Sequence, residues 1–179
     1  MKFGRFCLAF FVVSIFLSAC DRDTAVPAFD AVRAFGYLKA QVDFGPRVPG
    51  SAASAEARAY YLRHFQSTGF HVDSQRVVFR DPYSNAMIPL VDVIARHGGP
   101  KNGERLLLAA HYDCRPRAEY AFDTTRRDTP IDGANDGASG VAVLMELANL
   151  FHTRSPETEV DLVLFDGEDW GKSSELDYY

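Results

Sequence analysis

Two short apolar runs dominate the hydrophobic pattern of the chain, and polar residues follow each of them at once. Residues 105–110 lead into His111-Tyr112-Asp113, and residues 160–165 lead into Asp166-Gly167-Glu168-Asp169. Runs of this length and composition are typical of strands that are buried on both faces, as in a parallel sheet. An apolar helical stretch at residues 136–152 lies between them. Strand, helix and strand together predict a βαβ unit with parallel strands.

Two helices are predicted ahead of this unit. Helical spacing over residues 29–42 places Phe29, Val32 and Phe35 on one apolar face. Ser51 is suited to cap the second helix and Gly69 to end it. The apolar face expected for this second helix consists of Ala55, Ala59, Leu62 and Phe65.

Strand-like stretches follow at residues 76–80 and 88–96, with a turn at 81–85. The polar segment 114–132 shows no period, and a loop of this length inside a domain usually has a function. Because ligands bind beyond the carboxyl ends of strands in open α/β sheets, the polar residues after both runs predict an active site.

The composition indicates a globular domain with a net negative charge. The 179 residues are 47% hydrophobic and 24% charged, with a formal charge of -5, which is enough apolar sequence for one core. No basic patch is present to neutralise phosphates, so nucleic acid is excluded as the expected partner.

The first residues have the pattern of an export signal. Lys2 and Arg5 precede an apolar run at residues 6–17, which is too short for a stable membrane anchor. The run ends in Leu17-Ser18-Ala19-Cys20, which resembles the bacterial lipobox. We therefore expect residues 1–19 to be a lipoprotein signal peptide, Cys20 to be lipidated, and residues 20–28 to be a tether. The protein would then be exported and lipid-anchored, facing the periplasm or the exterior, whereas ordinary signal cleavage would leave Cys20 incidental.

Three polar clusters carry candidate metal chemistry, and each has a plainer interpretation. His111 and Asp113 lie two apart in an extended segment, so their side chains can converge as a metal ligand and its partner or as a hydrogen-bonded pair. Asp136, between Gly133 and Gly137, could ligate or bridge cations, or simply cap the helix.

The third cluster is the acidic turn after the second apolar run. Glu168 and Asp169 could divide acid–base catalysis and metal binding between them, or form a solvated turn. Taken together, the three clusters favour a catalytic zinc, because one imidazole with carboxylates and no thiolate is typical of such sites. Cys114 is a weaker candidate ligand, since the nearby carboxylates form a more complete set.

These motifs resemble those of a known enzyme family. His111-Tyr112-Asp113, the glycine-rich stretch at 133–140 and the acidic turn at 165–169 are similar to the signatures of the zinc exopeptidases of metallopeptidase family 28. The closest similarity is to its glutaminyl-peptide cyclotransferase (glutaminyl cyclase) branch. The segment Gly45-Pro46-Arg47 also resembles the stretch before that family's first core helix.

The resemblance implies a fold and a set of roles. The fold would be an α/β three-layer sandwich with a mostly parallel mixed sheet, phosphorylase/hydrolase-like, with residues 29–179 forming the N-terminal part of one domain. His111, Asp136 and Asp169 would bind one or two zinc ions, with His111 a ligand in two-metal members. Asp113 would orient His111, and Glu168 would be the general acid/base. The family's further carboxylate and final histidine are absent from this sequence, so we expect a fragment truncated at its C-terminus and inactive alone.

Three functions fit these residues, and all involve peptide or protein N-termini as partners. A cyclase would close an N-terminal glutamine and release ammonia, and Trp170 shortly after the acids favours this reading. An aminopeptidase would hydrolyse the first peptide bond. A non-catalytic binding ectodomain is disfavoured, because relatives of that kind typically lose the metal ligands. The pattern leaves the substrate and the oligomeric state open.

Overall fold

The computed structural model describes residues 26–82, 84–98 and 103–171. The predicted signal peptide and Cys20 lie outside the described residues. Among the helices within these ranges, none combines the length and apolarity needed to cross a membrane. The elements are α2 (Ala31–Asp43), α3 (Ala52–Ser67), β1 (His71–Arg80), β2 (Met87–His97), β3 (Arg105–His111), the short turns η1 (Thr124–Arg126) and η2 (Ala134–Ala138), α4 (Ser139–Thr153) and β4 (Glu159–Phe165).

The strands form one mixed sheet in the order β1-β2-β4-β3. β1 pairs antiparallel with β2, and β2 pairs antiparallel with β4. β3 pairs parallel with β4, and α4 connects them, which confirms the predicted βαβ unit. The α/β class with a mixed sheet is confirmed as well. The single parallel pair among the described strands is the one whose carboxyl ends carry the candidate chemistry.

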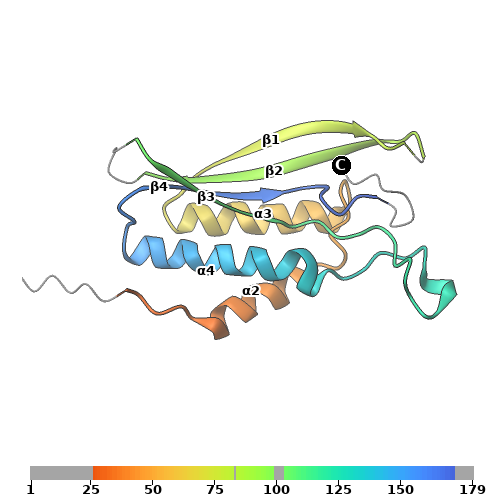
Figure 1. Ribbon diagram of the computed structural model, residues 1–179, viewed down its shortest axis with the longest axis horizontal. Helices are drawn as coiled ribbons and strands as arrows, with labels where there is room; N and C mark the ends of the chain where they lie inside the picture. The colour runs from red at the N-terminus through yellow and green to blue at the C-terminus, as the bar shows by residue number, and fades with distance from the viewer. Residues whose placement is uncertain (1–25, 83, 99–102, 172–179) are drawn as a thin grey trace, which may run out of the picture.

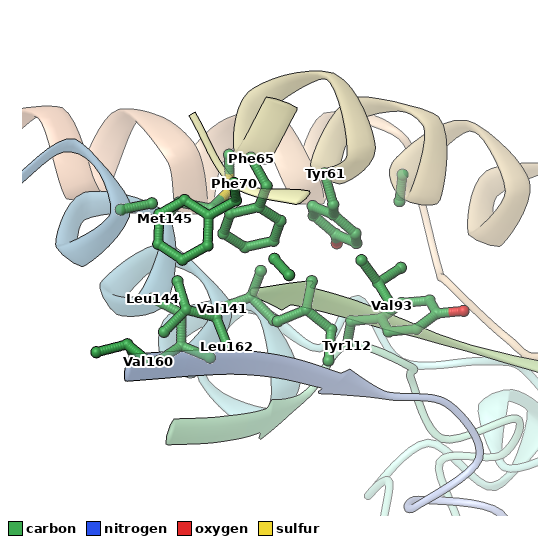
Figure 2. Close-up of a cluster of buried hydrophobic side chains, with 14 residues drawn as sticks. Tyr61, Phe65, Phe70, Val93, Tyr112, Val141, Leu144, Met145, Val160 and Leu162 are labelled. Atoms are coloured by element: carbon green, nitrogen blue, oxygen red, sulfur yellow. The ribbon is translucent and has the colours of Figure 1, made fainter. Parts of the chain in front are cut away.

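The core lies between the sheet and the two helices α3 and α4 (Figure 1). β4 is the central strand of this core, with five consecutive buried residues, because both of its edges are paired and α4 covers its inner face. Figure 2 shows the cluster of buried side chains between the sheet and these helices. Its labelled side chains are Tyr61, Phe65, Phe70, Val93, Tyr112, Val141, Leu144, Met145, Val160 and Leu162.

The first apolar run does not form a fully buried strand, in contrast to the expectation. Leu107 of β3 is 58% exposed and Leu106 is exposed as well. β3 lies at the edge of the described sheet, and the described helices all lie on one face of that sheet (Figure 1). The second helical layer of the expected sandwich is therefore not among the described residues.

α2 packs through a different face from the one predicted. Phe29, Val32 and Phe35 are exposed, with Val32 at 85%, whereas Ala34 and Gln41 are buried. Polar contacts set the rotation of the helix. Arg33 donates through Nε to the buried carboxylate of Glu146 in α4 at 2.7 Å. Gln41 Nε2 donates to the Ala138 carbonyl at 3.1 Å. Burying an unpaired carboxylate or amide costs more than exposing apolar side chains, so these contacts decide the packing.

α3 begins where the sequence indicates but is also rotated. The Ser51 hydroxyl accepts a hydrogen bond from the Ser54 backbone N–H at 3.1 Å, which confirms the predicted cap. Its buried residues are Ser54, Ala57, Tyr61 and Phe65, so only Phe65 of the predicted face is fully buried. β1 begins at His71, five residues before the predicted start, because polar residues in an exposed strand hide the alternation.

Candidate metal centre

The register of β3 and β4 brings two of the three polar clusters side by side. His111 is the partner of Phe165 in the parallel ladder, and the Tyr112 backbone N–H donates to the Phe165 carbonyl at 2.9 Å. The acidic turn that follows Phe165 therefore emerges next to the His111–Asp113 segment, as expected for adjacent parallel strands.

The third cluster reaches the same place through a bent turn rather than a helix. α4 begins at Ser139 and not at Asp136, which corrects the predicted helix start. Asp136 has extended backbone angles and Gly137 has φ +93°. A Cβ atom on Gly137 would lie 2.8 Å from the Asp113 carbonyl oxygen and 3.4 Å from His111 Cε1. The glycine thus lets the chain pass directly against the His111–Asp113 segment, and this close approach excludes a regular helix here.

The imidazole of His111 lies close to the carboxylates of Asp113, Asp136 and Glu168. Its Nε2 is 2.9 Å from Asp136 Oδ1, and its Nδ1 is 3.3 Å from Asp113 Oδ1 and 3.8 Å from Glu168 Oε2. The hydrogen bond to Asp113, and then the nearby negative charges, raise the pKa of His111 to about 9 despite partial burial. The imidazole is consequently protonated at neutral pH without a cation, and a metal ion binding there would displace a proton.

Asp113 is wholly buried and connects the first and third clusters. One carboxylate oxygen faces His111, and the other accepts a hydrogen bond from the Asp169 backbone N–H at 3.0 Å. This carboxylate therefore orients the imidazole and positions the acidic turn at the same time. Glu168, by contrast, projects from the turn with its side chain 61% exposed, so it can meet a molecule that arrives from solvent.

The two carboxylate oxygens of Asp169 differ in their hydrogen bonding. Its Oδ1 accepts a hydrogen bond from Arg115 Nη1 at 3.0 Å, while its buried Oδ2 has no hydrogen-bond partner. Burial raises the pKa of the Asp169 carboxyl, and Arg115 opposes this shift. A buried carboxylate oxygen without a partner is costly unless a cation or proton satisfies it.

The donor set fits zinc in type, although it is not gathered into a preformed cage. Within residues 26–171 as described, no three His, Cys, Asp or Glu side chains form a metal-binding group. The pair His111–Asp136 and the unpartnered oxygen of Asp169 are nonetheless nitrogen and oxygen donors of the kind that catalytic zinc takes. Cys114 is buried, donates from Sγ to the Asp132 carbonyl at 3.5 Å, and has a raised thiol pKa because of burial. It is not needed for this set.

Sequence reasoning overlooked three charged residues around the site. Arg47 is wholly buried and contacts the backbone on both sides of Asp113 and before Asp136. Arg115 holds Asp169. Asp166 accepts from the Val91 backbone N–H at 2.9 Å, and burial raises the pKa of its carboxyl to about 6. Arg47 and Asp166 stand in segments that the sequence singles out, Gly45-Pro46-Arg47 and the acidic turn, but neither pattern indicates a role for them, and Arg115 has no signal of its own.

Comparisons with known proteins show which family and which fold the chain is similar to. Residues 92–173, which contain all five predicted metal and catalytic residues, match the model of peptidase family M28. A Zn-dependent exopeptidase from Parabacteroides distasonis is 36% identical, with a TM-score of 0.80 over 87% of this chain and 53% of that chain.

Two further solved structures carry different activities in their names. A glutaminyl cyclase from Bacteroides thetaiotaomicron, bound to N-acetylhistamine, is 36% identical, with a TM-score of 0.79 over 87% of this chain and 52% of that chain. A leucine aminopeptidase precursor from the same species is 36% identical, with a TM-score of 0.79 over 87% of this chain and 53% of that chain. This chain thus spans about half the length of these solved structures. Residues 92–173 thus match peptidase family M28, and the described part of the chain has the zinc exopeptidase fold.

Proposed function

We propose that this protein is a zinc-dependent enzyme that acts on peptide N-termini, and that it cyclises an N-terminal glutamine with release of ammonia. The observation that carries the proposal is the position of His111 between Asp113 and Asp136, with Glu168 beside it at the carboxyl ends of β3 and β4. The similarity to a solved glutaminyl cyclase over 87% of this chain supports the same assignment.

In this proposal His111, Asp136 and Asp169 hold one or two zinc ions. A bound zinc ion supplies a Lewis acid that polarises the amide carbonyl of the substrate. Asp113 keeps the Nδ1 atom of His111 engaged, so that Nε2 is directed at the metal position. Arg115 occupies only one oxygen of Asp169 and leaves the other available as a ligand.

Glu168 is assigned to proton transfer because its side chain is exposed beside His111 and is not one of the carboxylates assigned to zinc. The α-amine nitrogen of the N-terminal glutamine attacks the side-chain amide carbon, and a carbon–nitrogen bond forms in a five-membered ring. Glu168 takes a proton from this amine and delivers it to the departing nitrogen, which leaves as ammonia when the original carbon–nitrogen bond breaks.

Aminopeptidase activity is the second candidate, and the similarity to a leucine aminopeptidase precursor favours it. The same residues would serve, with Glu168 taking a proton from the water that attacks the first peptide bond and giving it to the new amine. The position of Trp170 shortly after the acidic turn in the sequence supports the cyclase instead. Its indole N–H donates to Asp81 Oδ1 at 3.3 Å.

The experiment uses the full-length protein and combines zinc analysis with two substrates at equal concentration, a glutaminyl amide peptide and a leucyl amide. We expect bound zinc and ammonia release from the glutaminyl peptide, with no turnover after chelation. Free leucine as the main product would replace the cyclase by the aminopeptidase. A protein that binds no zinc and turns over neither substrate would contradict both and support a non-catalytic binding domain.

We further propose that Cys20 carries a lipid that anchors the exported protein to a bacterial membrane. The small residues before Cys20 at the end of an apolar run support this, and the described domain begins a few residues later. Replacement of Cys20 by Ser should move the protein from the membrane to the soluble fraction. Unchanged membrane association would show that the anchor lies elsewhere.

A further inference from the structure

Arg47 is a fully buried cation that binds backbone rather than a carboxylate. It lies in the loop between α2 and α3, and its side chain is inaccessible to solvent. In the part of the chain that the structure describes, its guanidinium forms no ion pair and donates only to carbonyl oxygens. The acceptors are the carbonyl groups of Gln41, Gly45, Tyr112, Asp132 and Gly133.

The first segment that Arg47 holds is the one that carries His111 and Asp113. Its Nε donates to the Tyr112 carbonyl at 3.0 Å, and its own carbonyl accepts from the Cys114 backbone N–H at 3.3 Å. Arg47 therefore contacts the residues immediately before and after Asp113. This double contact limits both sliding and rotation of the strand end where the imidazole and its carboxylate partner are placed.

The second segment leads into Asp136. Arg47 Nη1 donates to the Asp132 carbonyl at 3.1 Å, and Nη2 donates to the Gly133 carbonyl at 2.8 Å. Gly133 has φ +60°, and a Cβ atom there would lie 2.9 Å from Arg47 Nη2 and 2.5 Å from Cys114 Sγ. The absence of a side chain at Gly133 is what allows the three segments to meet.

We propose that Arg47 is a positioning residue that sets the separation between His111 and Asp136, and thereby the zinc affinity of the site. The inference rests on the proposed function. A long loop, residues 114–132, is the covalent connection between the two segments, so their relative position depends on contacts such as these. The planar guanidinium suits this role because its five N–H groups point in fixed directions, whereas a lysine ammonium cannot reach carbonyls on three sides at once.

The experiment compares five variants of the full-length protein with the unaltered protein, among them the Arg47→Ala variant used for chemical rescue. Arg47→Met and Arg47→Lys remove the forked guanidinium. Gly133→Ala keeps every charge and ligand but places a Cβ atom 2.9 Å from Arg47 Nη2 and 2.8 Å from the Asp136 carbonyl oxygen. Arg33→Met is the matched control, because Arg33 is also a guanidinium on the α2 side but binds Glu146 of α4. Two quantities are measured: zinc affinity by competition with a chromophoric chelator, and hydrogen exchange of the amides at 112–114 and 133–138.

We expect Arg47→Met and Gly133→Ala to weaken zinc binding by about 10- to 100-fold, as losses of residues that orient ligands do. Hydrogen exchange of the backbone amides should accelerate selectively at 112–114 and 133–138. Arg47→Lys should retain little of the zinc affinity of the unaltered protein. Arg33→Met should lower overall stability without this selective pattern. Millimolar guanidinium, but not ammonium, should partly restore zinc binding to an Arg47→Ala variant.

Two results would overturn the proposal. One is a folded Arg47→Met variant with unchanged zinc affinity and unchanged exchange in both segments. The other is an equal loss of zinc affinity in Arg33→Met, which would assign the effect to general destabilisation. If Arg47→Met fails to fold, Gly133→Ala and Arg47→Lys decide the same question. An unaltered protein that binds no zinc would contradict the proposed function, while the exchange comparison would still decide whether Arg47 joins the two segments.

Discussion

His111 Nε2 lies 2.9 Å from Asp136 Oδ1, although the two residues belong to separate segments joined by a long loop. The contact exists because β3 ends at His111 and the bent turn η2 passes against that strand end. The imidazole is thereby held between two carboxylates, Asp113 on Nδ1 and Asp136 on Nε2. A cation and the His111 proton must compete for this position.

Replacing Glu168 by Gln should abolish turnover while zinc remains bound. The side chain is exposed at the edge of the site and the amide cannot accept a proton, so the rate should fall by about 10²–10⁴-fold. Zinc content and rate are measured on the same preparation. Loss of zinc would make Glu168 a ligand, and retained activity would remove it from the mechanism.

Asp136→Ala and Asp169→Asn should each weaken zinc binding by at least about tenfold, because ligands matter no less than the groups that orient them. Asp128→Ala, an exposed acid in the neighbouring loop, is the matched control. Chelator competition measures all three. His111→Ala should reduce the zinc stoichiometry only if two ions bind, and full occupancy in Asp136→Ala would refute the ligand assignment.

Gly137→Ala should destabilise the protein by about 1–3 kcal/mol, since a side chain is strained at φ +93° and its Cβ would meet the Asp113 carbonyl oxygen. Zinc affinity should fall as well, because the turn must move away from His111. Gly103→Ala separates the two effects: its φ is +84°, but nothing lies within 4 Å of the new Cβ. Urea unfolding measures the free energy of unfolding of both variants. Equal losses of this free energy would mean that backbone strain alone destabilises Gly137→Ala.

Acidification should destabilise the fold through His64. Its Nε2 is 2.8 Å from the Met145 carbonyl oxygen, and burial lowers the pKa of its imidazole below 6.5. The unfolded chain therefore takes up a proton near pH 6.5 that the native state rejects, so the free energy of unfolding falls as pH drops below that value. Glu146 nearby opposes the shift and Arg33 reinforces it.

Urea titrations at pH 7.5 and 5.5 measure this dependence. His64→Gln keeps a donor to the Met145 carbonyl but cannot titrate, and it should reduce the loss of stability at pH 5.5. His71→Gln, at an exposed imidazole, is the control. An unchanged pH dependence in His64→Gln would assign acid sensitivity to other groups.

Local sequence patterns predicted much of this molecule because their physical causes are local. The apolar run at residues 160–165 became the buried central strand, and Ser51 capped its helix with the expected hydrogen bond. The clusters around His111 and Glu168 met because parallel strand ends share one edge, a consequence of the βαβ pattern alone.

The tertiary structure decided what depends on contacts between distant segments. The buried face of α2 follows Arg33 and Gln41 rather than the apolar spacing, because their partners are on α4 and η2. Asp136 lies in a bent turn because Gly137 approaches Asp113 too closely for a helix. Arg47 is buried among carbonyl groups from several segments, which no spacing along the chain could reveal. The sequence by itself determined which chemistry the chain carries, whereas polar contacts across the fold determined which faces are buried and how the candidate ligands are aimed.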